Sequence, residues 1–238
     1  MITLGLDTTT DRLSVAAGAP DGRRAQREAT GARRHAALLV PLALEALGDL
    51  GAGLDQVGAV AMSDGPGSFT GLRVAAAWAK AFTHARGIPL LAASTLLVRA
   101  MNAAATGVVL GLGTALRGEL YVGAYRFEPD GSIATVLRPN VLQPGAPLPG
   151  GIVPEVIVAD VDATRLGAWP WAERATIVAG EDGFPRARCL IDLVDVRGGA
   201  VRIDDVAGWE PEYGRPAEAQ ARWERAHGRS LDDPARIA

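Results

Sequence analysis

The chain contains very little cysteine, lysine and histidine, and each shortage excludes a kind of chemistry. Cys189 is the only cysteine, so the chain can form neither an internal disulfide nor a cysteine-based metal site. Lys80 is the only lysine, and neither a P-loop nor a Schiff-base motif surrounds it. The histidines, His35, His84 and His227, lie too far apart in sequence to form a local metal-binding pair. We therefore expect no metal site and no lysine-based catalysis.

The chain also lacks a strong net charge and a long hydrophobic run. Its formal net charge is -3 and its pI is near 5.7, which argues against direct binding to nucleic acid or to a membrane surface. No apolar run reaches membrane-spanning length, and Met1–Asp7 is typical of a buried strand and not of a signal peptide. We therefore expect a cytoplasmic protein.

What is present predicts a folded α/β protein. Hydrophobic residues make up 48% of the 238 residues, enough for one large domain or two small lobes. The first half predicts strands at 2–6, 13–17, 24–30, 57–62 and 89–93. Helices are predicted at 35–50, after the second-last of these strands up to about residue 86, and at 94–105. This order predicts a βββαβα lobe that closes near residue 105.

The second half restarts the same order and then weakens. Strand patterns at 108–112 and 120–127 are followed by 139–154, which is rich in proline and glycine and predicts a loop. Further strands are predicted at 156–161 and 175–179, and helices at 184–196 and 217–226. We therefore expect a first lobe at 1–105, a reduced second lobe at 106–207, and a segment at 208–238 that packs back on the first lobe.

The most distinctive stretch is Gly65 to Arg73, which reads Gly-Pro-Gly-Ser-Phe-Thr-Gly-Leu-Arg between a strand and a helix. Its glycines permit a tight turn, and the N–H groups that open the helix can hold an anion or a partner's acidic group. A P-loop would need lysine in place of Leu72, and a dinucleotide-binding turn would need glycine in place of Thr70. A well-made turn with no ligand is the alternative interpretation.

These nine residues resemble the signature of the TsaB (YeaZ) family, bacterial proteins of tRNA threonylcarbamoyladenosine synthesis in the actin/sugar-kinase/Hsp70-like superfamily. Flanking segments are similar to the family in the same order: Leu6-Asp7-Thr8-Thr9, Ser14-Val15-Ala16, His35, Ser94-Thr95-Leu96, Gly118-Glu119-Leu120-Tyr121 and Pro211-Glu212-Tyr213-Gly214-Arg215. The resemblance is strong to about residue 125 and patchy beyond it. It implies an α/β fold of two actin-like lobes, with the second lobe reduced.

The resemblance also implies a function. A TsaB-like chain is a non-catalytic subunit that binds and orders a TsaD-type catalytic paralogue, with a small TsaE-type ATPase as a further partner. The complex transfers threonylcarbamoyl to the adenosine next to the anticodon of tRNAs that read A-starting codons, so this chain would meet tRNA only through the complex. The resemblance implies no cofactor of the chain's own, ATP or ADP at or near the partner interface, and self-association as a homodimer as a further mode.

The site residues that the resemblance implies lie on the first two helices and the turn between strand and helix. The partner-interface candidates are Leu38, Leu42, Phe69, Arg73 and Trp78. The family-motif turn, Gly65, Pro66, Gly67, Ser68, Phe69, Thr70 and Gly71, would hold the second helix at the correct angle. From the sequence alone, ordinary core packing explains most of the apolar positions equally well.

Two enzyme classes are the alternatives to a subunit role. Asp7 follows the first strand, where the superfamily keeps a carboxylate near phosphates and Mg²⁺, although a turn-forming aspartate is the alternative reading. An autonomous actin-like ATPase or kinase would also need an acid where Thr114 stands. A serine hydrolase is more remote, because the elbow-like sequence around Ser63 lacks the first glycine of that motif. We therefore expect no catalytic residue in this chain.

Overall fold

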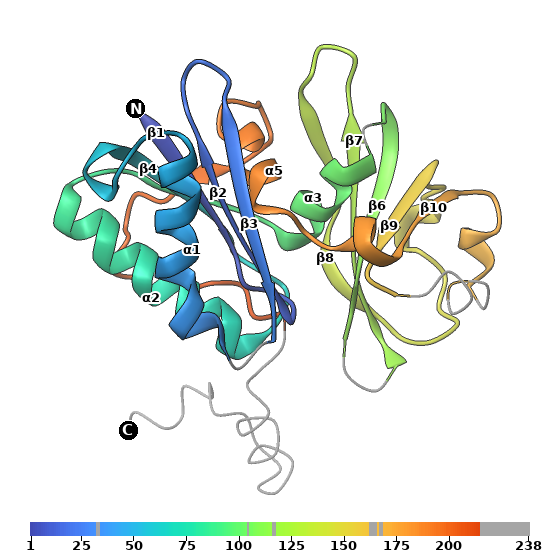
Figure 1. Cartoon of the computed structure of the whole chain (residues 1–238). Coiled ribbons are helices and arrows are strands. Elements are labelled where there is room, and N and C mark those ends of the chain that lie inside the picture. The colour runs from blue at the N-terminus through green and yellow to red at the C-terminus, as the bar shows by residue number, and fades with distance from the viewer. Residues whose placement is uncertain (32–33, 104, 116–117, 162–165, 167–168, 215–238) are drawn as a thin grey trace, which may run out of the picture.

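Two β-sheets form two lobes that lie side by side (Figure 1). The computed structural model describes residues 1–31, 34–103, 105–115, 118–161, 166 and 169–214. The first sheet has the order β11-β5-β4-β1-β2-β3 and the second has the order β10-β9-β6-β7-β8. The order β5-β4-β1-β2-β3 thus recurs as β10-β9-β6-β7-β8. This repeat confirms the predicted α/β fold of two actin-like lobes.

The strands are short, as the sequence patterns predict. The first sheet contains β1 (Ile2–Asp7), β2 (Arg12–Gly18), β3 (Arg24–Thr30), β4 (Val57–Ser63), β5 (Leu90–Ala93) and β11 (Val201–Arg202). The second contains β6 (Gly107–Thr114), β7 (Leu120–Phe127), β8 (Ile133–Leu142), β9 (Val156–Ala159) and β10 (Thr176–Val178). The strands at the centre of each sheet pair in parallel, β1 with β4 and β6 with β9. Their nearly continuous apolar sequences follow from burial on both faces.

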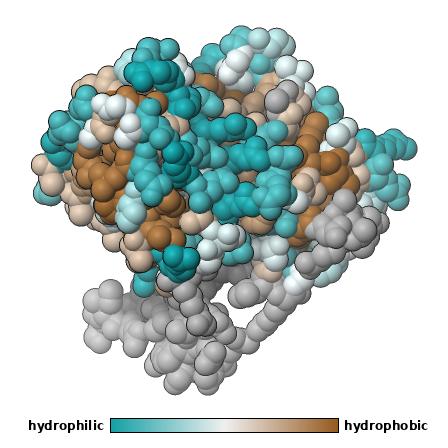
Figure 2. All heavy atoms as spheres, viewed as in Figure 1, coloured by the Kyte–Doolittle hydropathy of each residue, from teal (hydrophilic) through white to brown (hydrophobic). Residues whose placement is uncertain are grey.

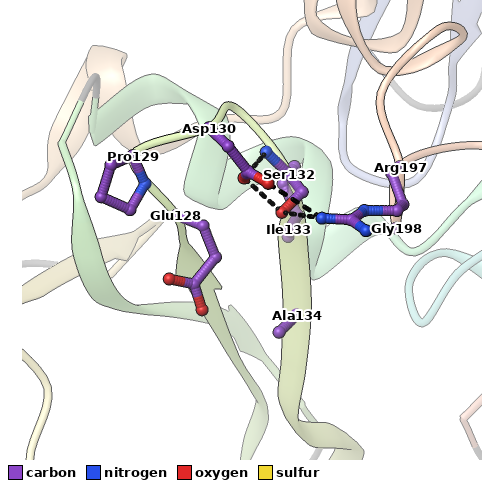
Figure 3. Close-up of a pocket in the computed structure, with 8 residues that line it drawn as sticks. All are labelled: Glu128, Pro129, Asp130, Ser132, Ile133, Ala134, Arg197 and Gly198. Carbon is purple, nitrogen blue, oxygen red and sulfur yellow. Dashed lines mark hydrogen bonds and ion pairs between the residues drawn. The ribbon is translucent and has the colours of Figure 1, made fainter.

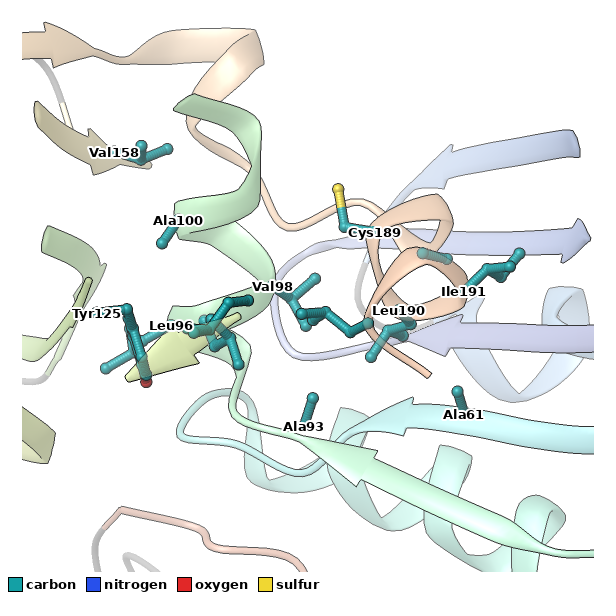
Figure 4. Close-up of a cluster of buried hydrophobic side chains, with 14 of the residues drawn as sticks. Ala61, Ala93, Leu96, Val98, Ala100, Tyr125, Val158, Cys189, Leu190 and Ile191 are labelled. Atoms are coloured by element: carbon teal, nitrogen blue, oxygen red, sulfur yellow. The ribbon is translucent and has the colours of Figure 1, made fainter. Parts of the chain in front are cut away.

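Two long helices cover the outer face of the first sheet. They are α1 (His35–Asp49) and α2 (Phe69–Arg86), and they share one hydrophobic core with β1, β2 and β4. Two short helices, α3 (Thr95–Ala100) and α5 (Ala187–Leu193), pack together between the two sheets (Figure 4). Single helical turns lie at Leu54–Gln56, Met101–Ala103, Pro149–Gly151, Pro170–Ala172 and Gly180–Gly183. Within the described ranges, no helix is both long and apolar enough to cross a membrane.

The structure corrects the first four residues of the predicted loop at 139–154 and confirms that 143–154 contain no strand. Strand β8 extends through Pro139 to Leu142 and pairs with β7. Proline is tolerated because β8 is the edge strand of its sheet and because the register shifts opposite Val122 and Ala124, where an extra residue is accommodated. The third helix is also shorter than predicted, because α3 ends at Ala100 and a single helical turn follows it.

The proposed boundaries at 105 and 207 stay a prediction. Helix α5 and strand β11, which the sequence assigns to the second lobe, contact the first sheet: α5 packs on β1 and β2, and β11 pairs with β5. The predicted helix at 217–226 lies outside the described residues. The chain therefore returns to the first lobe before residue 208.

A buried ion pair joins α3 to the second sheet. Arg99 is 2% exposed, and its Nη2 lies 3.0 Å from Oδ2 of Asp160, the residue after β9. The Nε and Nη1 groups of Arg99 have no hydrogen-bond partner in the described structure. Asp160 also accepts hydrogen bonds from the N–H and hydroxyl of Thr114, at 3.1 and 3.3 Å. One carboxylate therefore supports both the guanidinium and the end of β6.

We expect Asp160→Ala to reduce the free energy of unfolding by about 3 kcal/mol, because it leaves a buried guanidinium without a counter-charge. Asp130→Ala is the matched control: Asp130 likewise pairs with an arginine, Arg197, and accepts bonds from Ser132, but on the surface. Its loss should be much smaller, because water screens exposed pairs. Urea unfolding of both variants measures the difference, and equal losses would contradict a stabilising role for the buried pair.

Candidate functional site

The turn between β4 and α2, residues 65–71, is fastened to the turn that follows β1. The Ser68 N–H donates to the Thr9 carbonyl at 2.7 Å, and the Thr8 hydroxyl donates to the Gly71 carbonyl at 2.7 Å. The Ser68 hydroxyl caps α2 by accepting a hydrogen bond from the Gly71 N–H at 3.2 Å. One of the N–H groups that open α2 is thus already bonded. An anion at this turn stays a prediction.

Two glycines allow other backbone segments to touch this turn. A Cβ atom at Gly71 would overlap the carbonyl oxygen of Thr8, and a Cβ atom at Gly65 would overlap the carbonyl oxygen of Glu212. Gly65 also has a φ of +113°, which side chains other than glycine rarely tolerate. The turn therefore contains glycine because the chain presses on it from two sides. The motif is a contact point between the start of α2, the β1–β2 turn and the C-terminal segment.

Asp7 ends β1 and is fully buried. Its Oδ1 accepts hydrogen bonds from the N–H and hydroxyl of Thr9, at 3.1 and 2.9 Å, and its Oδ2 accepts one from Ser63. Burial raises the pKa of Asp7, whereas the hydrogen bonds from Ser63 and Thr9 and the charge of Arg99 lower it. These contacts are what a turn-forming aspartate makes. A position near a bound nucleotide stays a prediction.

Ser63 does not have the exposure that a serine nucleophile needs. Ser63 is 1% exposed, and its hydroxyl donates a hydrogen bond to Asp7. A nucleophile elbow instead presents its serine at the accessible top of a sheet. The structure therefore contradicts the serine hydrolase alternative.

The second lobe has a carboxylate that the sequence reading missed. Thr114 ends β6, as Asp7 ends β1. The carboxylate of Asp160 accepts hydrogen bonds from the backbone N–H and the hydroxyl of Thr114. No local motif marks Asp160, because it reaches Thr114 only when β6 and β9 pair. An acid is thus present beside the position where the family carries one, and its two oxygens already serve Thr114 and Arg99.

The structure separates the five partner-interface candidates. Leu42 is 9% exposed and belongs to the core under α1, while Leu38 and Trp78 are partly buried against the same core. The Arg73 guanidinium lies 4.2 Å from the centre of the Phe69 ring at the start of α2. Phe69 and Arg73 therefore come together near the surface, whereas Leu42 does not reach it.

A set of exposed apolar residues, interspersed with exposed polar residues such as Arg73 and His84, lies on the two helices. We call it the α1–α2 face, and it consists of Ala37, Pro41, Leu44, Ala77 and Ala81. Leu44 is 48% exposed and is the large apolar side chain of this face that lies most open to solvent. Figure 2 shows hydrophobic residues gathered over this part of the first lobe. The sequence missed Leu44 because its helix is apolar on several sides.

Between the lobes lies a cleft of about 580 Å³ whose lining includes two acidic residues. Asp64, directly after β4, and Glu212 line it together with Ser94, Tyr125 and Arg138. The Tyr125 hydroxyl donates to the Ser94 hydroxyl at 3.0 Å. Burial, and secondly the charge of Glu212, raise the pKa of Asp64 to about 7. The cleft thus holds a carboxyl group that titrates near neutral pH.

A hollow of about 640 Å³ lies beside the tip of the β7–β8 hairpin (Figure 3). Two of its charged groups pair with each other: Arg197 donates to Asp130 at 2.9 Å, and it also donates to the Ser132 hydroxyl at 3.2 Å. Ser132 in turn donates to Asp130 through its N–H and its hydroxyl. These bonds hold the hairpin tip to the segment after α5.

We expect Gly71→Ala to destabilise the protein by about 1–3 kcal/mol or more, because the added methyl group forces the Thr8 carbonyl away from the turn. Gly48→Ala is the matched control, since Gly48 also lies inside a helix but has open space around it. That change should stabilise the protein by about 0.5–1 kcal/mol through helix propensity. Denaturant unfolding tests both, and a neutral Gly71→Ala would show that the close contact does not constrain the turn.

The model of the family described as TsaD, tRNA N6-adenosine threonylcarbamoyltransferase, matches residues 29–160, more than half of the chain. The TsaB protein of Haemophilus influenzae, named for tRNA threonylcarbamoyladenosine biosynthesis, is 37% identical over 42% of this chain and 42% of its own. The TsaB protein of Bacillus subtilis is 26% identical over 94% of this chain and 98% of its own. The chain spans 35% to 63% of the length of three of its curated relatives.

A solved structure extends the likeness to the whole fold. YeaZ from Pseudomonas aeruginosa matches with a TM-score of 0.70 and 27% identity, over 89% of this chain and 99% of that one. The turn at 65–71, the repeated sheet order and these matches agree. The chain belongs to the family of TsaD-type proteins, and within it to the TsaB/YeaZ family.

Proposed function

We propose that this chain is a non-catalytic subunit for tRNA threonylcarbamoyladenosine synthesis, and that it binds and orders a TsaD-type catalytic partner through the α1–α2 face. The observation that carries the proposal is this apolar face of small side chains with Leu44 at 48% exposure, in a chain of the TsaB/YeaZ family. Small residues let a partner's helices approach closely, and the exposed leucine supplies area that a partner can bury.

The remaining parts of the proposal follow from the same family. A TsaE-type ATPase would join the complex in the cytoplasm, ATP or ADP would bind at or near the partner interface, and tRNA would be met only through the complex. Without its partner the chain would use the same face to form a homodimer. The acidic balance of the chain, with a formal net charge of -3, supports an indirect role toward tRNA.

Co-purification with the TsaD-type protein of the same genome tests the proposal, followed by a threonylcarbamoylation assay on transcript tRNA with and without this chain. Modification that requires both proteins, while this chain alone neither hydrolyses ATP nor modifies tRNA, would support a subunit. ATP hydrolysis by the isolated chain, with no affinity for the partner, would favour the autonomous actin-like ATPase or kinase.

Leu44→Glu should weaken partner binding by at least about tenfold, because a carboxylate would lose its water at the centre of an apolar contact. Val153→Glu is the matched control, since Val153 is an apolar side chain 69% exposed on the second lobe. Titration calorimetry with the partner measures both affinities. If the two variants bind alike, the face does not carry the contact.

Phe69 or Trp78 changed to a charged residue should also abolish the complex while leaving the isolated protein folded.

A further inference from the structure

The segment after β11, residues 203–214, crosses the α2 side of the first lobe and is called the strap here. Its residues Ile203, Val206 and Trp209 pack against the core under α1 and α2. Lys80 on α2 holds its middle: the ammonium group donates to the carbonyls of Ala207 and Trp209, at 3.0 and 2.7 Å. The single lysine of the chain thus fixes the strap to the second helix.

The end of the strap joins the cleft to the start of α2. The Glu212 N–H donates to the Asp64 carbonyl at 2.7 Å, and Glu212 forms part of the lining of the cleft. The next residue, Tyr213, places its ring 4.6 Å from the ring of Phe69, and the Arg73 guanidinium lies 5.8 Å from the Tyr213 ring. Two neighbouring residues of the strap therefore touch two different parts of the family-motif turn.

Docking of the strap places the exposed residue Glu212 in the lining of the same cleft as the partly buried Asp64. Among the described residues, no residue other than Asp64 hydrogen-bonds the Asp64 side chain. Burial raises the pKa of Asp64, and repulsion from Glu212 raises it further. The other elements that line the cleft present Ser94 before α3, Tyr125 on β7 and Arg138 on β8. Burial also raises the pKa of Tyr125, so its hydroxyl stays neutral beside Ser94. Repulsion between Asp64 and Glu212 is relieved when a proton binds there.

We propose that the strap is a proton-controlled latch: it stays docked at the cleft while Asp64 is protonated, and its Tyr213 end loosens when Asp64 ionises beside Glu212. The sign follows from linkage. With the strap docked, the pKa of Asp64 is raised from 3.8 to about 7, so the docked state binds the proton more tightly than a released state in which water reaches Asp64. Docking is therefore strongest at low pH, weakens as the pH rises toward 7, and levels off above it.

The latch would connect the cleft to the partner surface. The Tyr213 ring packs at a tilt against Phe69, next to Arg73, at the beginning of the helix that carries Ala77 and Ala81 of the α1–α2 face. Loosening the strap would remove this aromatic side chain from the edge of that face. This consequence rests on the proposed function, whereas the latch itself is a property of the isolated chain and is tested without a partner.

Hydrogen–deuterium exchange of the full chain, corrected for the intrinsic pH dependence of amide exchange, tests the latch between about pH 5.5 and 8.5. In the wild type, opening of residues 209–214 should increase several-fold, at most about tenfold per pH unit, up to about pH 7 and then level off. Asp64→Asn should keep the segment protected at every pH. Asp204→Asn is the control, because Asp204 lies in the strap with its side chain 96% exposed, and it should behave like the wild type.

A second variant guards against a change in folding. Glu212→Gln leaves the fold untouched at an exposed residue but removes the repulsion, so the wild-type transition should move to lower pH without disappearing. Protection of α2, read in the same spectra, reports whether each variant is folded. The latch is refuted if wild-type protection does not depend on pH, or if folded Asp64→Asn keeps the wild-type pH profile. Partner binding that fails for Leu44→Glu while the latch profile persists would separate the two proposals.

Discussion

Backbone-to-backbone contact at the turn before α2 is the constraint on which the rest of the first lobe depends. At Gly71 the turn touches the carbonyl of Thr8, and at Gly65 it touches the carbonyl of Glu212, with no room for a side chain at either place. Close-packed backbones cannot slide past each other without losing hydrogen bonds and contacts. The β1–β2 turn, the start of α2 and the strap consequently behave as one unit, and the direction of α2 is set where all three meet.

The polar groups at the ends of the central strands are used inside the protein. Asp7 accepts hydrogen bonds from Thr9 and Ser63, and Asp160 binds Arg99 and Thr114. A buried polar group that loses its partner costs free energy, so these bonds resist movement of the groups around them. The Arg99–Asp160 pair in this way ties α3 to the second sheet. The exposed Leu44 lies elsewhere, on the outer helices.

The sequence predicts the regular elements well because their patterns are local. Strands β1 and β2 and helix α2 follow from short apolar runs, the turn residues between them and the glycine-rich turn before the helix. The partner face could not be chosen in this way, since Leu42 and Leu44 are both leucines, about 200° apart around a helix that is apolar on several sides. Only packing against the sheet decides that Leu42 is buried and Leu44 exposed. Strand β8 was missed because proline is normally excluded from sheets, except at an edge.

The strap could not be foreseen for a different reason, and the same reason makes it suited to a switch. Beyond Ile203 its described hydrogen bonds to the rest of the lobe depend on single groups: the ammonium of Lys80 at its middle and the backbone of Asp64 near its end. Segments with so few bonds open at lower cost than the sheet they lie on. Lys80 binds two carbonyl oxygens and also lies 3.6 Å from the carboxylate of Glu210, whereas the other end of the strap lies beside Asp64. A change at the cleft should therefore free the Tyr213 end first and leave the lobes in place, which confines its effect to the start of α2.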